Sequence, residues 1–158
     1  MSLAIISRHY KLNGYKIYTN IKSLKDKDFY LSEIKENFYN DDSSPKLLAI
    51  DEIYLWIDSR MSTSKRNKIY GYILMQSRKN GFDVVYTTNY YKAVDVRIRN
   101  LTDYIIEPEY TKIGDNEGLL KWTIYDKDLN LLATAKLSID NRVFKLFDTK
   151  EKIAIPNL

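Results

Sequence analysis

One stretch of the chain, residues 46–60, constrains the fold more than any other. Its apolar run, residues 47–50, follows a turn-forming Ser-Ser-Pro and leads directly into two adjacent carboxylates, Asp51 and Glu52. A short apolar run bounded by turn residues is typical of a buried strand. In open α/β sheets, ligands bind just beyond the carboxyl ends of such strands. The sequence therefore predicts a buried strand that delivers two acids to a binding edge.

The composition limits the chemistry available at that edge. The chain has 158 residues, 44% of them hydrophobic, which is enough for one globular domain with its own core. It has no cysteine and a single histidine, His9, which excludes thiolate and histidine-rich metal sites. A metal would therefore be held by oxygens, which favours magnesium, manganese or calcium, and magnesium is the candidate cofactor.

Neither targeting nor membrane signals are visible in the sequence. No apolar run approaches the ~20 residues of a membrane span. The first residues lack the long apolar core and the cleavage site of a signal peptide. We therefore expect a soluble, cytoplasmic protein that has no membrane partner.

Strands alternate with helices over the first two thirds of the chain. The predicted helices cover residues 2–12, 29–39, 63–80 and 90–100, and the predicted strands cover residues 15–19, 47–50, 83–88 and 104–106. Ser62 or Thr63 is the expected cap of the third helix. This alternation indicates a mainly parallel sheet covered by helices on both faces.

The pattern changes in the last third of the chain. Two β segments, residues 119–125 and 131–139, flank a turn and predict an antiparallel hairpin, whereas residues 143–153 fit a strand or a helix equally well. We predict a single α/β domain over residues 1–158, with a core at 1–107 and a β-hairpin extension at 108–158.

A basic segment follows the two acids. Residues 59–82 contain no acid, in a chain whose net charge is +4, and carry six cations: Arg60, Lys65, Arg66, Lys68, Arg78 and Lys79. A helix of one charge sign favours contacts with phosphates, and double-stranded DNA is the partner we predict. A solvated helix face is the alternative interpretation.

The two acids also have two interpretations. Asp51 can hold magnesium while Glu52 orients or deprotonates a water molecule. Alternatively, they form a strand-end turn in which one acid caps the next helix. Arg97 and Arg99 also have two interpretations. They can have a functional role, or they can simply suit the helix dipole, which favours basic residues near the end of a helix.

Taken together, these segments resemble a known family. Residues 47–52 resemble a Walker B strand. Residues 56–67, 76–81, 84–89, 95–103 and 144–149 follow in the order found in zonula occludens toxin-like and FtsK/HerA-like P-loop ATPases, which move DNA and include viral packaging ATPases.

This resemblance implies a P-loop-like three-layer sandwich and a set of roles. Asp51 would support magnesium and Glu52 would activate water. Thr88 and Asn89 would form the sensor at the end of the next strand, although glutamine is common where Asn89 stands. Arg97 or Arg99 would reach a phosphate held by a neighbouring subunit.

The phosphate-binding loop of that family is missing, so the predicted sandwich is incomplete. No Gly-x-x-x-x-Gly-Lys-Ser/Thr run is present, and the first residues resemble the helix that follows the loop, with Ser2 at the position of its last hydroxyl. The strand before the loop, an interior strand in that family, is missing as well, which exposes backbone groups unless neighbours close the gap. We expect a short protein that begins at Met1 and has no ATP site.

These features predict a DNA-binding or DNA-processing protein derived from a packaging or translocase ATPase, without a working P-loop. One alternative is a magnesium-dependent nuclease that cuts double-stranded DNA, in which Asp58 or Asp83 joins the two acids. A second alternative is a non-catalytic subunit, in a homo-oligomer or with a partner ATPase, that lends Arg97 or Arg99 in trans.

Overall fold

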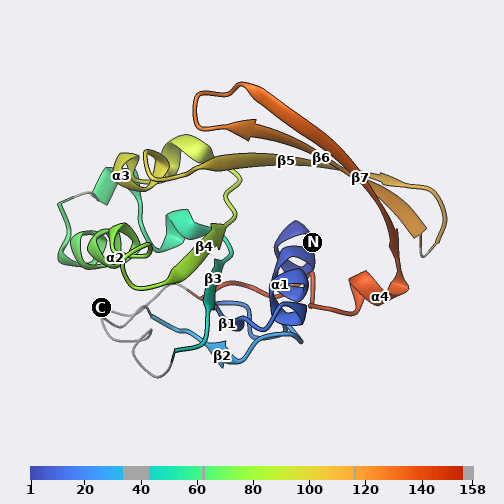
Figure 1. Cartoon of the computed structure of the whole chain (residues 1–158), viewed down its shortest axis with the longest axis horizontal. Helices are drawn as coiled ribbons and strands as arrows, with labels where there is room; N and C mark the ends of the chain where they lie inside the picture. Colours follow the sequence, from blue (N-terminus) through green and yellow to red (C-terminus); the bar gives the residue numbers. More distant parts are fainter. Residues whose placement is uncertain (34–42, 62, 116, 155–158) are drawn as a thin grey trace.

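The chain forms two β-sheets with a helix between them. The structure is a computed structural model and describes residues 1–33, 43–61, 63–115 and 117–154. One sheet is parallel and has four strands, and the other is antiparallel and has three. In Figure 1 the antiparallel sheet arches over helix α1 (Ser2–Leu12), which lies beside the parallel sheet.

The parallel sheet has the order β2-β1-β3-β4. These strands are Phe29–Tyr30, Lys16–Thr19, Lys46–Ile50 and Phe82–Tyr86, respectively. All five residues of β3 are buried, as expected for an apolar run in the middle of a sheet. Among the described residues no strand pairs with the outer edge of β4, so the sheet ends there.

Successive side chains of β3 serve two different cores. Leu47 and Ala49 pack with Leu3 and Ala4 of α1. Leu48 and Ile50 belong to the opposite cluster, which contains Trp56 and, from helix α2 (Lys65–Met75), Tyr70, Ile73 and Leu74. Because side chains alternate across a strand, one apolar run supports a helix layer on each face of the sheet. The predicted α/β arrangement is confirmed.

The third sequence-predicted helix is shorter than expected. It begins after Ser64, whose hydroxyl accepts a hydrogen bond from the amide of Asn67 at 3.2 Å, so neither Ser62 nor Thr63 is its cap. It ends at Met75, and turns continue to Gly81, whose φ of 66° lies in the left-handed region that favours glycine.

The predicted helix over residues 90–100 is divided. A short 3-10 helix, η3 (Tyr91–Ala93), is followed by α3 (Val96–Arg99). Asp95 lies between them and caps α3 by accepting a hydrogen bond from the amide of Arg97. An aspartate bonded to the backbone in this way starts a new helix instead of continuing the old one. Two further 3-10 helices, η1 (Ile53–Leu55) and η2 (Ser59–Met61), lead from β3 to α2.

Two other predictions differ from the structure. The expected helix at residues 29–39 is wrong at its start, because Phe29 and Tyr30 form β2, which pairs with β1. Its residues 34–39 lie outside the described part. The segment at 104–106, expected as a parallel strand closed by Pro108, is the beginning of β5 (Tyr104–Lys112), which belongs to the other sheet.

The antiparallel sheet contains β5, β6 (Glu117–Asp126) and β7 (Leu131–Asp140), in that order. The predicted hairpin is β6-β7, and β5 extends it by a third strand. Pro108 does not interrupt β5, because this strand lies at an edge, where a proline costs no hydrogen bond on the outer side. The boundary expected between residues 107 and 108 falls within β5.

The segment after β7 returns to the parallel sheet. A short helix, α4 (Asn141–Phe144), is followed by an irregular segment whose Leu146 carbonyl accepts from the amide of Lys25 at 2.9 Å. The carboxylate of Glu151 accepts from the amides of Lys22 and Ser23 at 2.6 and 2.8 Å. Within the described ranges no helix has the length and apolarity needed to cross a membrane.

We expect Leu48→Ala to destabilise the fold strongly. Leu48 is fully buried in β3 between Tyr18 and Val84 of the neighbouring strands. Removing such a side chain leaves a cavity and costs about 2–5 kcal/mol of unfolding free energy. Urea denaturation measures the loss. The control is Leu12→Ala at a side chain that is 78% exposed, where a change within about 0.5 kcal/mol is expected; equal losses in the two variants would contradict this core.

Candidate functional site

Hydrogen bonds between strand ends hold Asp51 at the carboxyl edge of the parallel sheet. The side-chain amide of Asn20, which follows β1, donates to the Asp51 carbonyl and accepts from the Asp51 amide, both at 2.8 Å. From the other side, the hydroxyl of Thr87, which follows β4, donates to Oδ1 of Asp51. The Asp51 carboxylate is thus positioned by both strands adjacent to β3.

Glu52 is held in an unusual backbone conformation. Its φ and ψ angles are 52° and 53°, a left-handed conformation that costs about 1–2 kcal/mol for a residue other than glycine. Its amide donates to the Thr87 hydroxyl at 3.1 Å, and the next amide, of Ile53, donates to the Thr87 carbonyl at 3.0 Å. Asn89 donates from Nδ2 to Oε1 of Glu52 at 2.5 Å. The strained residue is therefore fixed at both its backbone and its side chain.

The environment of Glu52 disfavours its charged form. Partial burial raises the pKa of its carboxyl, and the negative charge of Asp51 raises it further, while Tyr54 and Asn89 lower it. Oε2 of Glu52 is buried and accepts no hydrogen bond from the described residues. A carboxyl with a raised pKa is better suited to accept a proton than an ordinary surface glutamate.

The two acids line a cavity of about 360 Å³. The start of α1, through Met1 and Ser2, forms one part of its wall, and Thr87 and Asn89 form another. The remaining walls come from β5, β6 and the segment after α4, with these apolar and acidic residues: Pro108, Tyr110, Leu120, Phe147, Asp148, Glu151 and Ile153. Its described lining contains no lysine, arginine or histidine side chain.

The antiparallel sheet contributes to this cavity through two contacts that the sequence did not suggest. Trp122 of β6 donates from Nε1 to the hydroxyl of Ser2 at 3.0 Å, which joins this sheet to the start of α1. Within the sheet, the ring of Tyr110 lies directly against Gly118, where an added Cβ would collide with it, and Tyr110 lines the cavity. The shape of the cavity therefore depends on both sheets.

Neither of the two further carboxylates expected near the acid pair, Asp83 and Asp58, joins it. Asp83 pairs with Leu47, four residues before Asp51 along the sheet, which separates the two by about 13 Å. Asp58 is bound by its own neighbour Arg60, with a shortest distance of 2.7 Å. In the described part of the chain, no three acidic or histidine side chains are arranged to hold a metal. Two carboxylates still fit magnesium, which commonly takes one or two from the protein and completes its shell with waters and phosphate oxygens.

Thr87 occupies the place expected for Thr88. Thr88 accepts from the amide of Tyr90 and contacts neither acid, whereas Asn89 does reach Glu52. Asn20 and Thr87 were both missed in the sequence. The signal was available, since each is the first polar residue after a strand that borders β3, and parallel strands end at the same edge.

The two candidate arginines are engaged within their own segment. Arg97 pairs with Asp95 at 2.7 Å, and its guanidinium lies 3.8 Å from the position that a Cβ on Gly71 of α2 would take. Arg99 donates to the Val94 carbonyl at 3.0 Å and lies over the ring of Tyr91. Neither arginine lines the cavity.

The six basic residues differ in how far their charges are compensated. Arg60 pairs with Asp58, and Arg78 pairs with Asp103 at 2.5 Å. Arg66 is partly buried. The remaining three lysines are exposed, and no ion pair of theirs is found among the described residues: Lys65, Lys68 and Lys79.

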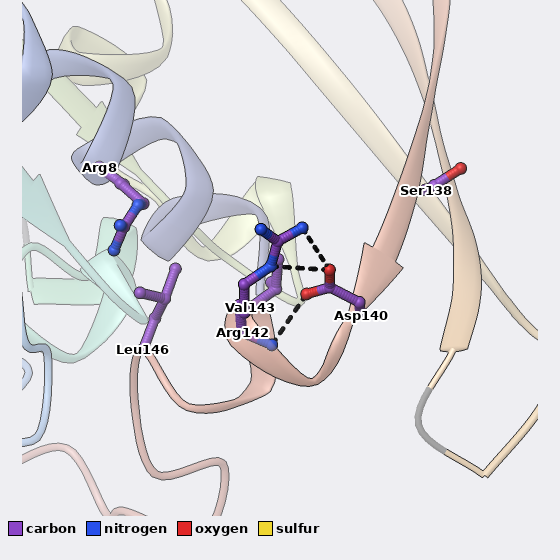
Figure 2. A pocket seen from close by; sticks show the side chains of 6 residues that line it. All are labelled: Arg8, Ser138, Asp140, Arg142, Val143 and Leu146. Atoms are coloured by element: carbon purple, nitrogen blue, oxygen red, sulfur yellow. Dashed lines mark hydrogen bonds and ion pairs between the residues drawn. The ribbon is translucent and has the colours of Figure 1, made fainter.

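A second cavity, of about 230 Å³, lies between α1 and the end of β7. Figure 2 shows Arg142 beside Asp140, with hydrogen bonds from both the backbone and the guanidinium of Arg142 to the Asp140 carboxylate. Arg8 lies on the α1 side of the cavity. Asp140 pairs with Arg142 and Asp26 pairs with Arg8, so this cavity offers little net charge to a ligand. It contains none of the sequence-predicted residues.

The chain is similar to proteins of one known family. The family model of zonular occludens toxin matches residues 7–152. The crystal structure of the N-terminal domain of zonular occludens toxin from Neisseria meningitidis resembles this chain with a TM-score of 0.56 and 18% identity, covering 85% of this chain and 80% of that one. No curated protein sequence matches the chain.

The solved structure establishes similarity of fold, and the family model covers nearly the whole chain. The resemblance deduced from the Walker B-like strand and the segments that follow it is confirmed. This chain belongs to the zonular occludens toxin family.

Proposed function

We propose that this chain is a DNA-handling domain that binds double-stranded DNA through the exposed side of α2. The observation that supports the proposal is an uncompensated basic and aromatic surface on that helix. We call this surface the α2 face and define it by Lys65, Lys68, Tyr72 and Met75. Tyr72 is 63% exposed and Met75 50% exposed.

The spacing of these residues places them together. Positions separated by three or four residues lie on one side of an α-helix, so the four side chains form one stripe along the 11-residue helix. The opposite side of α2, with Tyr70, Ile73 and Leu74, packs into the core. Lys79 lies just beyond the end of the helix and extends the basic character of the α2 face.

The α2 face carries the chemical groups that bind a phosphate backbone, namely lysines and a tyrosine hydroxyl. Lysines that neutralise phosphates release the counterions condensed on DNA, which gives affinity without sequence preference. A tyrosine hydroxyl can donate to phosphate or sugar oxygens. A solvated face would ordinarily carry acids among its lysines, and residues 59–82 have none.

A second candidate function, hydrolysis of a phosphoester, is supported by the acid pair. Asp51 and Glu52 line one cavity together with Thr87 and Asn89. A magnesium ion bound there would supply charge neutralisation for a phosphate group. Asp51, oriented by Thr87, is the residue suited to hold the ion, and Glu52, with its raised pKa, is suited to take a proton from water.

Replacing Lys65, Lys68 and Lys79 together by alanine is expected to weaken binding to duplex DNA and flatten its salt dependence. The slope of log K against log salt should become less steep by about 0.9 for each lysine that contacts a phosphate. Fluorescence anisotropy with a labelled duplex at several salt concentrations measures both quantities.

The matched control removes the same charge elsewhere. Lys25, Lys145 and Lys150 are exposed near the segment that follows α4, and their triple alanine variant has the same net charge as the test variant. Equal effects of the two variants would show that binding depends on net charge alone and would exclude the α2 face.

Glu52→Gln is expected to stabilise the fold at neutral pH while removing any hydrolytic activity. Since folding raises the pKa of Glu52 above its ordinary value of 4.5, the ionised group opposes folding, and this cost is absent below pH 4.5 and grows as the pH rises through the folded pKa. Glutamine keeps the oxygen that accepts from Asn89 and carries no charge. The thermal midpoint of the variant should therefore exceed that of the wild type at pH 7 and approach it near pH 4.

The same variant distinguishes the two candidate functions. Glu117→Gln, at an exposed site on β6, is the control for the thermal measurement. Cutting of linear duplex DNA that requires magnesium, stops with EDTA and is lost in Glu52→Gln would support hydrolysis. Unchanged cutting in that variant would remove the acid pair from the reaction, and an identical thermal midpoint at both pH values would contradict the environment described for Glu52.

A further inference from the structure

We propose that the outer edge of β7 is a self-association surface at which two copies of this chain pair antiparallel and join their three-stranded sheets into one. Among the described strands, β7 is the last of its sheet and pairs with β6 alone. In Figure 1 it forms the outermost border of the molecule, and no described element lies beyond it. A strand in this position presents unpaired backbone amides and carbonyls to a partner.

The exposed part of β7 is weakly protected against such pairing, since its protective features are a register shift at Leu132 and one lysine, Lys136. Residues 131–134 and 136 are exposed, and residues 129–135 contain no charge and no proline. Leu131 and Leu132 are 64% and 52% exposed, which is unusual for leucines on an unpaired edge. Charged side chains and prolines are the usual protection of natural edge strands.

The opposite edge of the same sheet is protected in the usual way. β5 carries Pro108, which has no amide hydrogen, between Glu107 and Glu109, and ends in Lys112. The two edges therefore differ, although both are exposed. A contact between β7 of one copy and β5 of the next would meet these groups, whereas a contact between two copies of β7 would not.

The register of pairing follows from the sequence of β7. Leu132 has no partner on β6, because the register shifts between Ile124 and Tyr125, so the regular part of the uncharged run is residues 133–135. A two-fold axis at its midpoint pairs Thr134 with Thr134 of the second copy, and Ala133 with Ala135. Threonines directly opposite each other are a favourable cross-strand pair.

Electrostatics selects the antiparallel arrangement. With the axis at Thr134, Lys136 of one copy lies opposite Leu132 of the other, and the two lysines are four residues apart along the strands. That spacing is about 13 Å, beyond the ~8–10 Å over which salt screens exposed charges at physiological ionic strength. A parallel pairing in register would place the two lysines side by side. The two-fold contact also closes, so it predicts a dimer and no larger assembly.

The test uses opposite charges at the axis. Sedimentation equilibrium of the full chain is expected to give a wild-type mass twice the 18.7 kDa of one copy. Thr134→Lys and Thr134→Glu each place two like charges in contact, so each should be a monomer, with dissociation constants raised at least tenfold. An equimolar mixture of the two variants should recover the dimer, because lysine then faces glutamate across the axis.

The control for this test is a lysine substitution on the opposite edge of the same sheet. Thr111→Lys makes the same change at an exposed position of the other edge strand, β5, and should leave the dimer intact. Circular dichroism establishes that each variant is folded. A monomeric wild type, a mass above that of a dimer, a Thr134→Lys variant that still dimerises, or a mixture that stays monomeric would each overturn the proposal.

Discussion

The hydrogen bonds that join the ends of three parallel strands are the constraint on which the candidate site depends. Asn20 after β1 and Thr87 after β4 both bind the segment that follows β3, and they do so through side chains that contact Asp51 and Glu52. This network holds Glu52 in a left-handed conformation that its own side chain disfavours. Backbone strain of this kind persists only where several contacts oppose its relief, so the two acids are set by the sheet as a whole and not by a local turn.

The sequence predicted β3 and its acids well because their information is local. Four apolar residues with a Ser-Ser-Pro turn before them and two carboxylates after them are too short a run for a helix and fit a buried strand. The pairing of residues 104–112, in contrast, depends on contacts that are distant in the sequence. Their partner is β6, which lies farther along the chain, and nothing in β5 itself distinguishes antiparallel pairing with a later strand from parallel pairing with β4. The predicted start of α2 was wrong for a related reason. Ser62, Thr63 and Ser64 are equivalent caps by residue type, and only the packing of α2 selects among them.

The charges of the molecule are separated into two surfaces with different chemistry. The described lining of the larger cavity includes Asp51, Glu52, Asp148 and Glu151 and no basic side chain. The uncompensated lysines lie instead on and beyond α2, which covers one face of the parallel sheet, whereas α1 and the antiparallel sheet enclose the cavity on the other. Binding of a phosphate backbone and chemistry at the acid pair therefore belong to separate places, and each can be altered without the other.

This separation restricts what the cavity can accept. A phosphate that approached four carboxylates without a compensating cation would be repelled, because charges within a few ångströms interact more strongly in a partly enclosed site than in water. Repulsion between like charges also acts between the two acids, since the charge of Asp51 contributes to the raised pKa of Glu52. The N-terminal ammonium of Met1 also lines the cavity and interacts with Asp51, and two backbone amides bind the carboxylate of Glu151. The remaining negative charge favours a ligand that is positively charged or that arrives together with a cation that Asp51 and Glu52 can share.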